Sequence, residues 1–372
     1  MTVFKVAVIA AARGGFIRAA PLLAELGARP ELEVSFIFAG EDYVSHAASE
    51  VFRELALPYA DVVIAASEGT PAQRLAKIMA GCERLAVSGD LAAVVLVGAS
   101  HALLGCALAS ARSVPVVAHA DAGLRLPGSA GRISLAARID RLATALMAAS
   151  EPAHCRLLDE GALEDSVVLA GSLACDAVAQ CIGRARADNC PARAGLQPKG
   201  YALAIIESPY NIDRLANLHK LVELLSRAQE CLPVALGVNA RLATQLENWG
   251  LAQAVASLPR LSSVEPAGYV EYLSFLDAAR MVLTDVGGVQ DEATFLGVPC
   301  LTLAEATDRA ATVETGANLL VSLDLTLAMQ AVEALTENEY LRPPLPAAWD
   351  GRASQRIAHA LTALLRGNAA PG

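Results

Sequence analysis

The chain is poor in aromatic residues and in charge, and it lacks basic runs. Phe, Trp and Tyr make up 4% of its 372 residues, charged residues make up 18%, and apolar residues make up 54%. The net charge is −10, and no run of Lys or Arg stands out. Clusters of positive charge bind nucleic acids and anionic membranes, so we expect neither as a partner. An anionic ligand would have to be held by a few local arginines and by helix N-termini.

Paired cysteine motifs are also missing. None of the eight cysteines forms a CxxC pair or has zinc-finger spacing with histidine, so we predict no metal site and no cofactor. Most of the cysteines lie in apolar contexts, which indicates buried free thiols. The first residues, MTVFKVAVIAAARGG, lack the basic region and the small-residue cleavage site of a signal peptide. We therefore expect a cytoplasmic protein.

One apolar stretch, residues 91–111, carries no Asp, Glu, Lys or Arg and is long enough to span a membrane. Its composition changes along its length. Residues 94–97 are mostly β-branched, Gly98-Ala99-Ser100 is typical of a turn, and a helical pattern follows from His101. A buried strand, a turn and a helix explain this stretch better than a membrane span does.

Strands alternate with helices along the sequence, which predicts parallel, doubly wound sheets. We expect strands at residues 4–11, 32–38, 92–97, 115–119 and 166–169, and a helix over 134–148. A second series of strands covers residues 201–206, 232–236, 261–264, 281–284 and 319–321. The predicted fold class is therefore α/β, with two Rossmann-like domains facing a central cleft.

The length suits two domains, and a polar stretch with Pro and Gly separates the two strand series. We predict an N-terminal domain over residues 1–184, a linker over 185–200, and a C-terminal nucleotide-binding domain over 201–350. The last segment, 351–372, should be a helix that packs back on the N-terminal domain. In such an architecture the ligand lies at the carboxyl ends of both sheets.

The segment MVLTDVGGVQDEATFLGVPC, residues 281–300, has the pattern of strand, glycine turn and helix. Gly287 and Gly288 form the turn, so the free N–H groups of the next helix would point to the carboxyl edge of the sheet. A phosphate group is the usual ligand there, and Glu292 lies one turn into the helix, where it could bond ribose hydroxyls. An ordinary turn that needs glycine for its geometry is the alternative.

Five motifs in order resemble those of the UDP-N-acetylglucosamine 2-epimerase family. AARGGFIRAAP (11–21) is similar to GTRPExIKxAP, HADAGLR (119–125) to HVEAGLR, and SPYNID (208–213) to RPSNVD. TDVGGVQDEATFLGVPCL (284–301) is similar to TDSGGIQEEAPxLGxPxL, and DRAATVETGANLLV (308–321) to ERPExxxxGxNxLV. The resemblance implies a GT-B-like fold, a UDP-sugar as ligand and a homodimer.

The resemblance also implies roles for individual residues. The amides of Gly287 and Gly288 would hold the diphosphate, Glu292 the ribose, and Tyr272 would stack on uracil. The alternative for Tyr272 is a core aromatic on a helix face. The complete set of substrate-binding residues implied is Arg13, Arg18, His119, Arg125, Arg138, Tyr272, Gly287, Gly288, Glu292, Arg309 and Asn318.

The match is weakest at the residues that transfer protons. Epimerases of the family eliminate UDP across C1–C2 of the sugar and add it back on the other face, which requires general acids and bases. Two carboxylates of the family motifs correspond to Ala99 and Leu135 here, and a histidine corresponds to Glu207. The remaining catalytic candidates are Asp121, Glu207 and His101, although His101 could equally be a helix cap or a core histidine.

Three functions remain open. The first is C2 epimerisation of a UDP-sugar, with or without UDP hydrolysis, by a remodelled acid/base set. The second is a diverged nucleotide-sugar hydrolase or glycosyltransferase-like enzyme. The third is a catalytically inactive UDP-sugar-binding homologue or partner subunit. Each general acid or base contributes roughly 10²–10⁴-fold to a rate, so the loss of three such groups argues against the ordinary mechanism.

Overall fold

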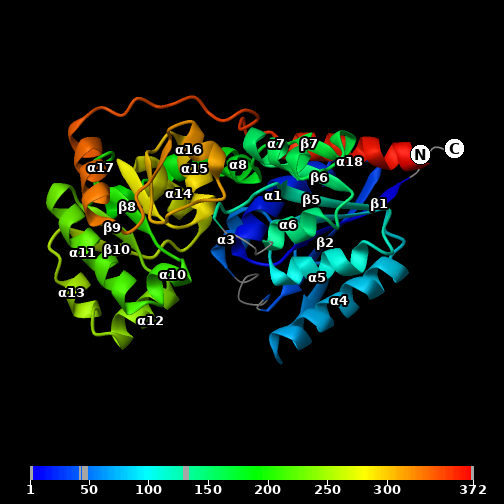
Figure 1. Ribbon diagram of the computed structural model, residues 1–372, viewed down its shortest axis with the longest axis horizontal. Helices are drawn as coiled ribbons and strands as arrows, with labels where there is room; N and C mark the ends of the chain where they lie inside the picture. The colour runs from blue at the N-terminus through cyan, green and yellow to red at the C-terminus, as the bar shows by residue number, and fades with distance from the viewer. Residues whose placement is uncertain (1–2, 42, 44–48, 129–133, 370–372) are drawn as a thin grey trace. The chain divides into compact units, whose positions relative to one another are not determined.

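The computed structural model describes residues 3–41, 43, 49–128 and 134–369. The chain divides into two compact units, shown in Figure 1. Unit 1 comprises Met1–Gln180 together with Pro346–Gly372, and unit 2 comprises Cys181–Leu345. The chain therefore leaves unit 1, forms unit 2, and returns to unit 1 at its end.

Unit 1 contains a seven-stranded sheet in its described part, and every neighbouring pair of strands is parallel. The spatial order is β3-β2-β1-β4-β5-β6-β7. The strands are β1 (Phe4–Ala10), β2 (Leu32–Gly40), β3 (Val62–Ala65), β4 (Ala93–Val97), β5 (Val116–Ala122), β6 (Ala145–Ala148) and β7 (Val167–Leu169).

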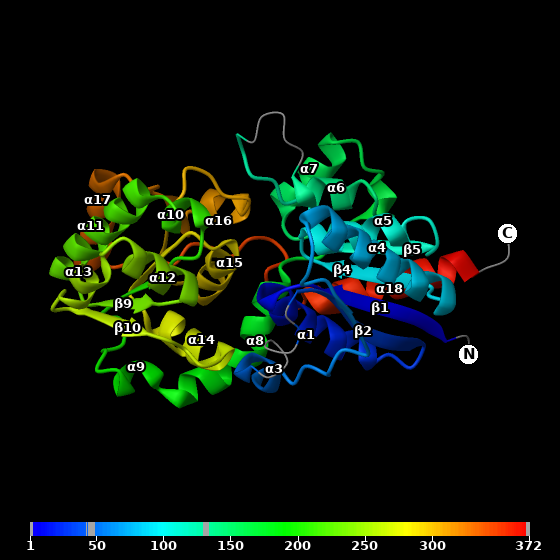
Figure 2. The ribbon, with the colours of Figure 1, turned by 90° about the horizontal axis from the view of Figure 1, so that it is seen from below.

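Helices cover both faces of this sheet (Figure 2). One face is covered by α1 (Arg13–Gly27) and by α18 (Ala353–Ala369), whose apolar side chains share one core with β1, β4 and β5. The opposite face is covered by α4 (Pro71–Ser88), α5 (His101–Ser110) and α6 (Leu135–Asp140). The remaining described helices that begin in unit 1 are α3 (Glu50–Glu54), α7 (Glu151–Asp159), the 3₁₀ turn η1 (Glu164–Ser166) and α8 (Leu173–Asp188).

Unit 2 repeats this plan with a six-stranded parallel sheet in the order β10-β9-β8-β11-β12-β13. Its strands are β8 (Ala202–Ile205), β9 (Val234–Gly237), β10 (Leu261–Val264), β11 (Met281–Thr284), β12 (Cys300–Thr302) and β13 (Asn318–Leu320). In Figure 1, α11 (Leu215–Cys231), α13 (Ala252–Ala256) and α17 (Leu325–Glu337) lie on one side of the sheet, and α14 (Tyr269–Ala278) and α15 (Gly287–Leu296) on the other. The shorter or peripheral helices are α9 (Cys190–Arg193), α10 (Pro209–Ile212), α12 (Ala240–Asn248) and α16 (Ala310–Glu314).

The central strands are apolar runs because helices bury them on both faces. All five residues of β4 and all four residues of β11 are buried. In each sheet the strand order reverses beside the first strand, between β1 and β4 in unit 1 and between β8 and β11 in unit 2. Loops diverge at such a reversal, and in open α/β sheets ligands bind outside the carboxyl ends of the strands at this point.

Residues 91–111 form β4, a turn and the ten-residue helix α5. No helix within the described residues is long and apolar enough to cross a membrane. The helix expected over 134–148 is wrong in its second half: α6 ends at Asp140, and residues 145–148 are the strand β6. The sequence Ala-Leu-Met-Ala favours a helix, but here it is buried between β5 and β7, and its tertiary surroundings override that preference.

The predicted linker over 185–200 also differs from the structure. The two units divide at residues 180 and 181, inside α8, and residues 185–200 complete α8 and form α9. This segment packs on unit 2: Arg186 forms a 2.9 Å ion pair with Asp277, and the backbone N–H of Lys199 donates to the carbonyl of Ala278. A polar composition here reflects an exposed helix surface and not a free connection.

Candidate functional site

The reversal point of unit 1 carries a partly buried ion pair. Arg18, on α1, places a guanidinium nitrogen 2.5 Å from Oδ2 of Asp121, and its Nε donates to the carbonyl of Gly14. The side chain of Asp121 is 4% exposed. A Cβ at Gly98, which follows β4 and has φ +85°, would lie 2.6 Å from the Arg18 guanidinium. A residue without a side chain is therefore needed for Arg18 to lie across the end of β4 and reach β5.

Asp121 sits in an irregular part of β5. The register with β6 shifts between Ala120 and Ala122, and Asp121 has φ +63°, in the left-handed region. A bulge of this kind turns a side chain away from its regular direction, and strained backbone of this kind is found at functional sites. The bulge aims the Asp121 carboxylate at Arg18.

His119 lies two residues before Asp121 and is completely buried. Its Nδ1 is 2.5 Å from Oδ1 of Asp140, and its Nε2 is 3.0 Å from the carbonyl oxygen of Gly98. Asp140 also accepts a hydrogen bond from the backbone N–H of Gly123 and pairs with Arg125 at 2.7 Å. Burial would raise the pKa of Asp140, but the contacts with His119 and Arg125 outweigh it and lower that pKa.

These contacts bear on the role expected for two residues. His119 and Arg125 were predicted to bind substrate directly, yet His119 is enclosed in the core, and Arg125 pairs with both Asp140 and Glu160. In the structure their polar atoms contact the backbone and Asp140 on either side of Asp121, and substrate binding by these two residues stays a prediction.

The other candidates in unit 1 are accessible. Arg13 is the first residue of α1 and His101 the first residue of α5, and both are exposed, as is Arg138 on α6. Ser100 is the N-cap of α5, since its hydroxyl accepts a hydrogen bond from the backbone N–H of Leu103. His101 is therefore neither the cap nor a core histidine.

The reversal point of unit 2 presents the N-terminus of α15. The residue before the helix, Val286, has no side-chain oxygen with which to cap it. A Cβ at Gly287 would lie 3.0 Å from Nε of Arg309, whereas a Cβ at Gly288 would meet no atom of the described residues within 4 Å. A side chain at residue 287 would thus crowd Arg309, and Gly288 faces open space where an anion can reach the first turn.

Arg309 brings a buried positive charge to this turn. It is 9% exposed, and its Nε lies 3.6 Å from a carboxylate oxygen of Asp291 and 3.6 Å from one of Asp308. The helix dipole favours an anion beside Gly288, and the guanidinium, which Asp291 and Asp308 partly neutralise, supplies positive charge at the same turn.

Glu292, one turn into α15, is held by two tyrosines of α14. The hydroxyl of Tyr269 donates to Oε1 at 2.8 Å and the hydroxyl of Tyr272 donates to Oε2 at 2.6 Å. The two rings stack with centroids 5.9 Å apart. Burial first, and then the charge of Glu292, raise the pKa of both phenols well above the ordinary value of 10. Glu292 therefore fixes the ring of Tyr272, which is only half-buried.

Asp285 connects the two loops of the reversal point, a role that the sequence did not indicate. Its Oδ1 accepts hydrogen bonds from the backbone N–H groups of Glu207 and Ser208, and its Oδ2 accepts one from the side chain of Asn211. Burial raises the pKa of Asp285. The backbone that carries Glu207 is thereby fixed to the end of β11, and the side chain of Glu207 is exposed.

Asn318 differs from its prediction as a substrate contact. It is 4% exposed, its Oδ1 accepts a hydrogen bond from Thr302, and its Nδ2 donates to Gln290 and Thr312. Its side chain is used inside unit 2, in a network beneath Arg309. Glycine motifs are local in sequence, whereas this network joins residues from several elements and gave no sequence signal.

The comparisons with known proteins decide the family. The sequence model described as UDP-N-acetylglucosamine 2-epimerase matches residues 24–362. The chain belongs to this family. It is 28% identical to the UDP-N-acetylglucosamine 2-epimerase of Methanocaldococcus jannaschii, over 96% of this chain and 99% of that protein. It is 27% identical to the UDP-2,3-diacetamido-2,3-dideoxy-D-glucuronate 2-epimerase of Pseudomonas aeruginosa, over 97% of this chain and 100% of that protein.

Solved structures of UDP-N-acetylglucosamine 2-epimerases share the fold. The structure of the Methanocaldococcus jannaschii enzyme in complex with UDP-GlcNAc and UDP matches 97% of this chain and 100% of that chain, with a TM-score of 0.84 and 27% identity. A Listeria monocytogenes structure matches with a TM-score of 0.83 at 20% identity and covers 100% of this chain. The predicted GT-B-like α/β fold and the predicted epimerase-type isomerase family are confirmed.

Against the motifs of the UDP-N-acetylglucosamine 2-epimerase family, two carboxylate positions in unit 1 are apolar. Ala99 is exposed between β4 and α5, and Leu135 begins α6 and packs against the core beneath α4 and α5. Neither side chain can transfer a proton. Within the described residues, no group of three His, Cys, Asp or Glu side chains is placed to hold a metal ion.

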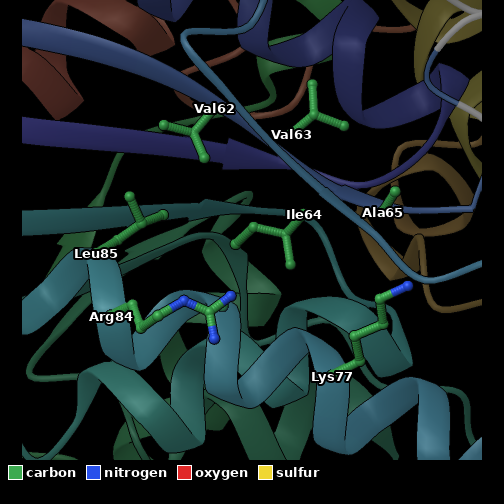
Figure 3. A pocket seen from close by; sticks show the side chains of 8 residues that line it. Val62, Val63, Ile64, Ala65, Lys77, Arg84 and Leu85 are labelled. Atoms are coloured by element: carbon green, nitrogen blue, oxygen red, sulfur yellow. The ribbon is translucent and has the colours of Figure 1, made fainter.

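One cavity lies apart from these residues. It has a volume of about 370 Å³ and is lined by strand β3 and by one face of α4, from which Lys77 and Arg84 extend toward it (Figure 3). None of the predicted site residues lines this cavity. The candidate residues of this epimerase-family chain therefore lie at the two reversal points, one in each unit.

Proposed function

We propose that this protein binds a UDP-sugar and epimerises it at C2. Unit 2 would bind the UDP group, and Asp121 and His101 of unit 1, with Glu207 of unit 2, would transfer the protons. The observation that carries the proposal is the first turn of α15, where open space at Gly288 adjoins the buried charge of Arg309. The related enzyme from Methanocaldococcus jannaschii, crystallised with UDP-GlcNAc and UDP, supports the same class of ligand.

The geometry of unit 2 supports its proposed binding of the UDP group. The diphosphate would accept hydrogen bonds from the first turn of α15 and from Arg309, because both offer positive charge at one place. Tyr272 would stack on the uracil, and Glu292, which holds Tyr272, would accept from the ribose hydroxyls. Each of these groups is kept in place by a contact inside unit 2.

Epimerisation at C2 requires two steps, elimination of UDP and its addition back to the sugar. A base removes the C2 proton while UDP leaves from C1; UDP then returns to C1 as a proton is delivered to C2 from the other face. Asp121 is the carboxylate proposed as a proton-transfer group in unit 1, and its position is fixed by Arg18 and the bulge in β5. Glu207 and His101 would supply the remaining proton transfers.

A second candidate function has its own supporting observation. The Asp121 carboxylate is already bonded to Arg18, and Ala99 and Leu135 cannot transfer protons. These features favour a catalytically inactive UDP-sugar-binding homologue or partner subunit. A diverged nucleotide-sugar hydrolase or glycosyltransferase-like enzyme is the other alternative to epimerisation.

Isotope exchange separates these functions. The protein is incubated in D₂O with UDP-GlcNAc, and in parallel with UDP-2,3-diacetamido-2,3-dideoxy-D-glucuronate, while NMR follows the C2 proton and UDP release. We expect C2 exchange, reduced roughly 10²–10⁴-fold by Asp121→Asn. Asp159→Asn, at the exposed end of α7, is the control.

Each other outcome identifies a different function. UDP binding without exchange or UDP release would leave the inactive binder. UDP release without a C2-epimeric sugar would identify a hydrolase, and transfer of the intact sugar to an acceptor would identify a glycosyltransferase-like enzyme.

We further propose that the protein is a homodimer, as the family resemblance implies. Light scattering coupled to size-exclusion chromatography should give twice the 38.5 kDa mass of the chain at micromolar concentration. A mass of one chain at that concentration would contradict the dimer without affecting the proposed ligand.

A further inference from the structure

A buried polar network lies beneath the diphosphate site of unit 2. We call it the Gln290 network. It consists of Gln290, Thr302, Thr307, Thr312 and Asn318, none more than 6% exposed. Buried polar groups are costly unless their hydrogen bonds are made, so a network of this size needs a structural or functional reason.

The hydrogen bonds of the network converge on Gln290 and Asn318. The hydroxyl of Thr307 donates to Oε1 of Gln290 at 2.6 Å, and Nδ2 of Asn318 donates to the same oxygen at 3.2 Å. Nδ2 of Asn318 also lies 3.0 Å from the Thr312 hydroxyl, and Thr302 donates to Oδ1 of Asn318 at 2.7 Å. Residues from α15, β12, β13 and α16 and from the loop before α16 are thereby joined.

Both backbone polar atoms of Arg309 are held by this network. Its N–H donates to the Thr307 hydroxyl at 3.1 Å, and its carbonyl accepts from the Thr312 hydroxyl at 2.7 Å. Arg309 has φ −97° and ψ 53°, outside the helical and extended regions. The same carbonyl also accepts from the backbone N–H of Thr312 at 3.0 Å, so the two hydroxyl groups add to one backbone hydrogen bond in holding a conformation outside regular structure.

The network is also joined to the helix turn that the Arg309 guanidinium lies against. Gln290 is in the first turn of α15, and its backbone N–H donates to the carbonyl of Val286. A Cβ at Gly287, in the same turn, would lie 3.0 Å from Nε of Arg309. The first turn of α15 is thus connected to Arg309 in two ways. The Arg309 side chain lies against Gly287, and Gln290 is hydrogen-bonded to Thr307, which binds the Arg309 N–H.

We propose that the Gln290 network is a positioning device for the diphosphate. It holds Arg309 against the first turn of α15, so that the helix N-terminus and the guanidinium form one preorganised surface for an anion. This inference rests on the proposed binding of UDP. Preorganised charges are stronger ligands because no ordering cost is met on binding, and the network acts on the phosphates and leaves the nucleoside contacts unchanged.

The test compares UDP with uridine, which lacks the diphosphate. Isothermal titration calorimetry gives both dissociation constants for the wild type, Thr312→Val and Thr312→Ser. Valine keeps the shape of threonine but removes the hydroxyl that holds the Arg309 carbonyl, whereas serine keeps it. We expect Thr312→Val to weaken UDP binding about tenfold and uridine binding by less than about twofold, with Thr312→Ser near the wild type.

Matched variants separate positioning from general loss of structure. Thr336→Val is the control, because Thr336 lies on α17 of the same unit and its hydroxyl donates to the carbonyl of Val332, outside the network. It should change neither constant. If Thr312→Val does not fold, Thr307→Val and Thr307→Ser make the same comparison at the Arg309 N–H.

Two results would overturn the inference, and they are distinguishable. In the first, the wild type binds UDP, but the folded valine variants either lose UDP and uridine affinity equally or lose neither. The network then has no specific role at the phosphates. If the wild type itself does not bind UDP, the proposed function fails and the inference fails with it.

Discussion

Asp121, Arg18 and Gly98 depend on one another at the end of the unit 1 sheet. The guanidinium occupies the space that a Cβ of residue 98 would need, and the same guanidinium binds Asp121. The site therefore places two requirements on residue 98: a positive φ and the absence of a side chain.

Gly98→Ala tests these two requirements against a matched position. Gly161 also has a positive φ but no atom of the described residues within 4 Å of its would-be Cβ. Gly161→Ala should cost about 1–2 kcal/mol from backbone strain alone. Gly98→Ala should cost about 1–3 kcal/mol more in urea unfolding, because the methyl group displaces Arg18. In an Arg18→Ala background the two costs should become equal; an undiminished difference would contradict a clash with Arg18.

The buried carboxylate of Asp140 should make the free energy of unfolding depend on pH in the acid range. Its pKa is lowered in the folded state from 3.8, so its contribution is complete above pH 3.8 and is lost as the pH falls through the lower, folded value. Asp140→Asn should cost about 3 kcal/mol or more at pH 7, since a buried charge pair is broken. In urea unfolding at several pH values, the difference in free energy of unfolding between Asp140→Asn and the wild type should narrow below pH 3.8. A gap that stays constant or widens there would contradict the assignment.

At the scale of elements, α14 and α15 form one hydrogen-bonded pair at the proposed nucleotide site. Glu292 of α15 accepts hydrogen bonds from two tyrosines of α14, so the proposed ribose and uracil contacts share one anchor. Glu292→Ala should leave the two phenols without their acceptor and release the ring of Tyr272. We expect UDP to lose its stabilising effect in a thermal shift assay. Glu314→Ala, exposed on α16, should keep the full shift, and an unchanged shift in Glu292→Ala would refute the ribose assignment.

Elements built around glycine turns were predictable, and those defined by burial were not. The strand, glycine turn and helix at 281–296 could be predicted because the chain needs small residues where α15 begins. The strand β6 could not, because its four residues favour a helix and only its two neighbouring strands make it extended. Strand β3 at the sheet edge was missed because it is short and partly exposed.

The same distinction applies to the candidate site. Gly287, Glu292 and Tyr272 lie in motifs whose order along the chain resembles one family, so their placement together was predictable. The contacts of His119 with Asp140 and of Asn318 with Gln290 join residues 21 and 28 positions apart. Such pairs leave no local pattern, and for that reason the sequence did not predict the buried hydrogen bonds of His119 and Asn318.

At the scale of the whole molecule, the two units have the same strand order around the reversal but different chemistry. At its reversal point unit 1 has the ion pair of Arg18 and Asp121, whereas unit 2 has the N-terminus of α15 with Arg309 beside it. UDP should therefore stabilise unit 2 first. The two tryptophans report on the units separately, because Trp249 lies in unit 2 and Trp349 lies in unit 1, where its indole N–H donates to Ala149.

Single-tryptophan variants turn this difference into a measurement. Trp349→Phe leaves the unit 2 signal and Trp249→Phe leaves the unit 1 signal during thermal unfolding followed by fluorescence. A ligand at 100 times its Kd stabilises the state that binds it by about 2.7 kcal/mol, or about 5–10 °C for a unit of this size. We expect the Trp249 transition to rise by that amount with UDP and the Trp349 transition to rise less. A rise confined to Trp349 would place the nucleotide on unit 1 and contradict the assignment of the diphosphate to α15.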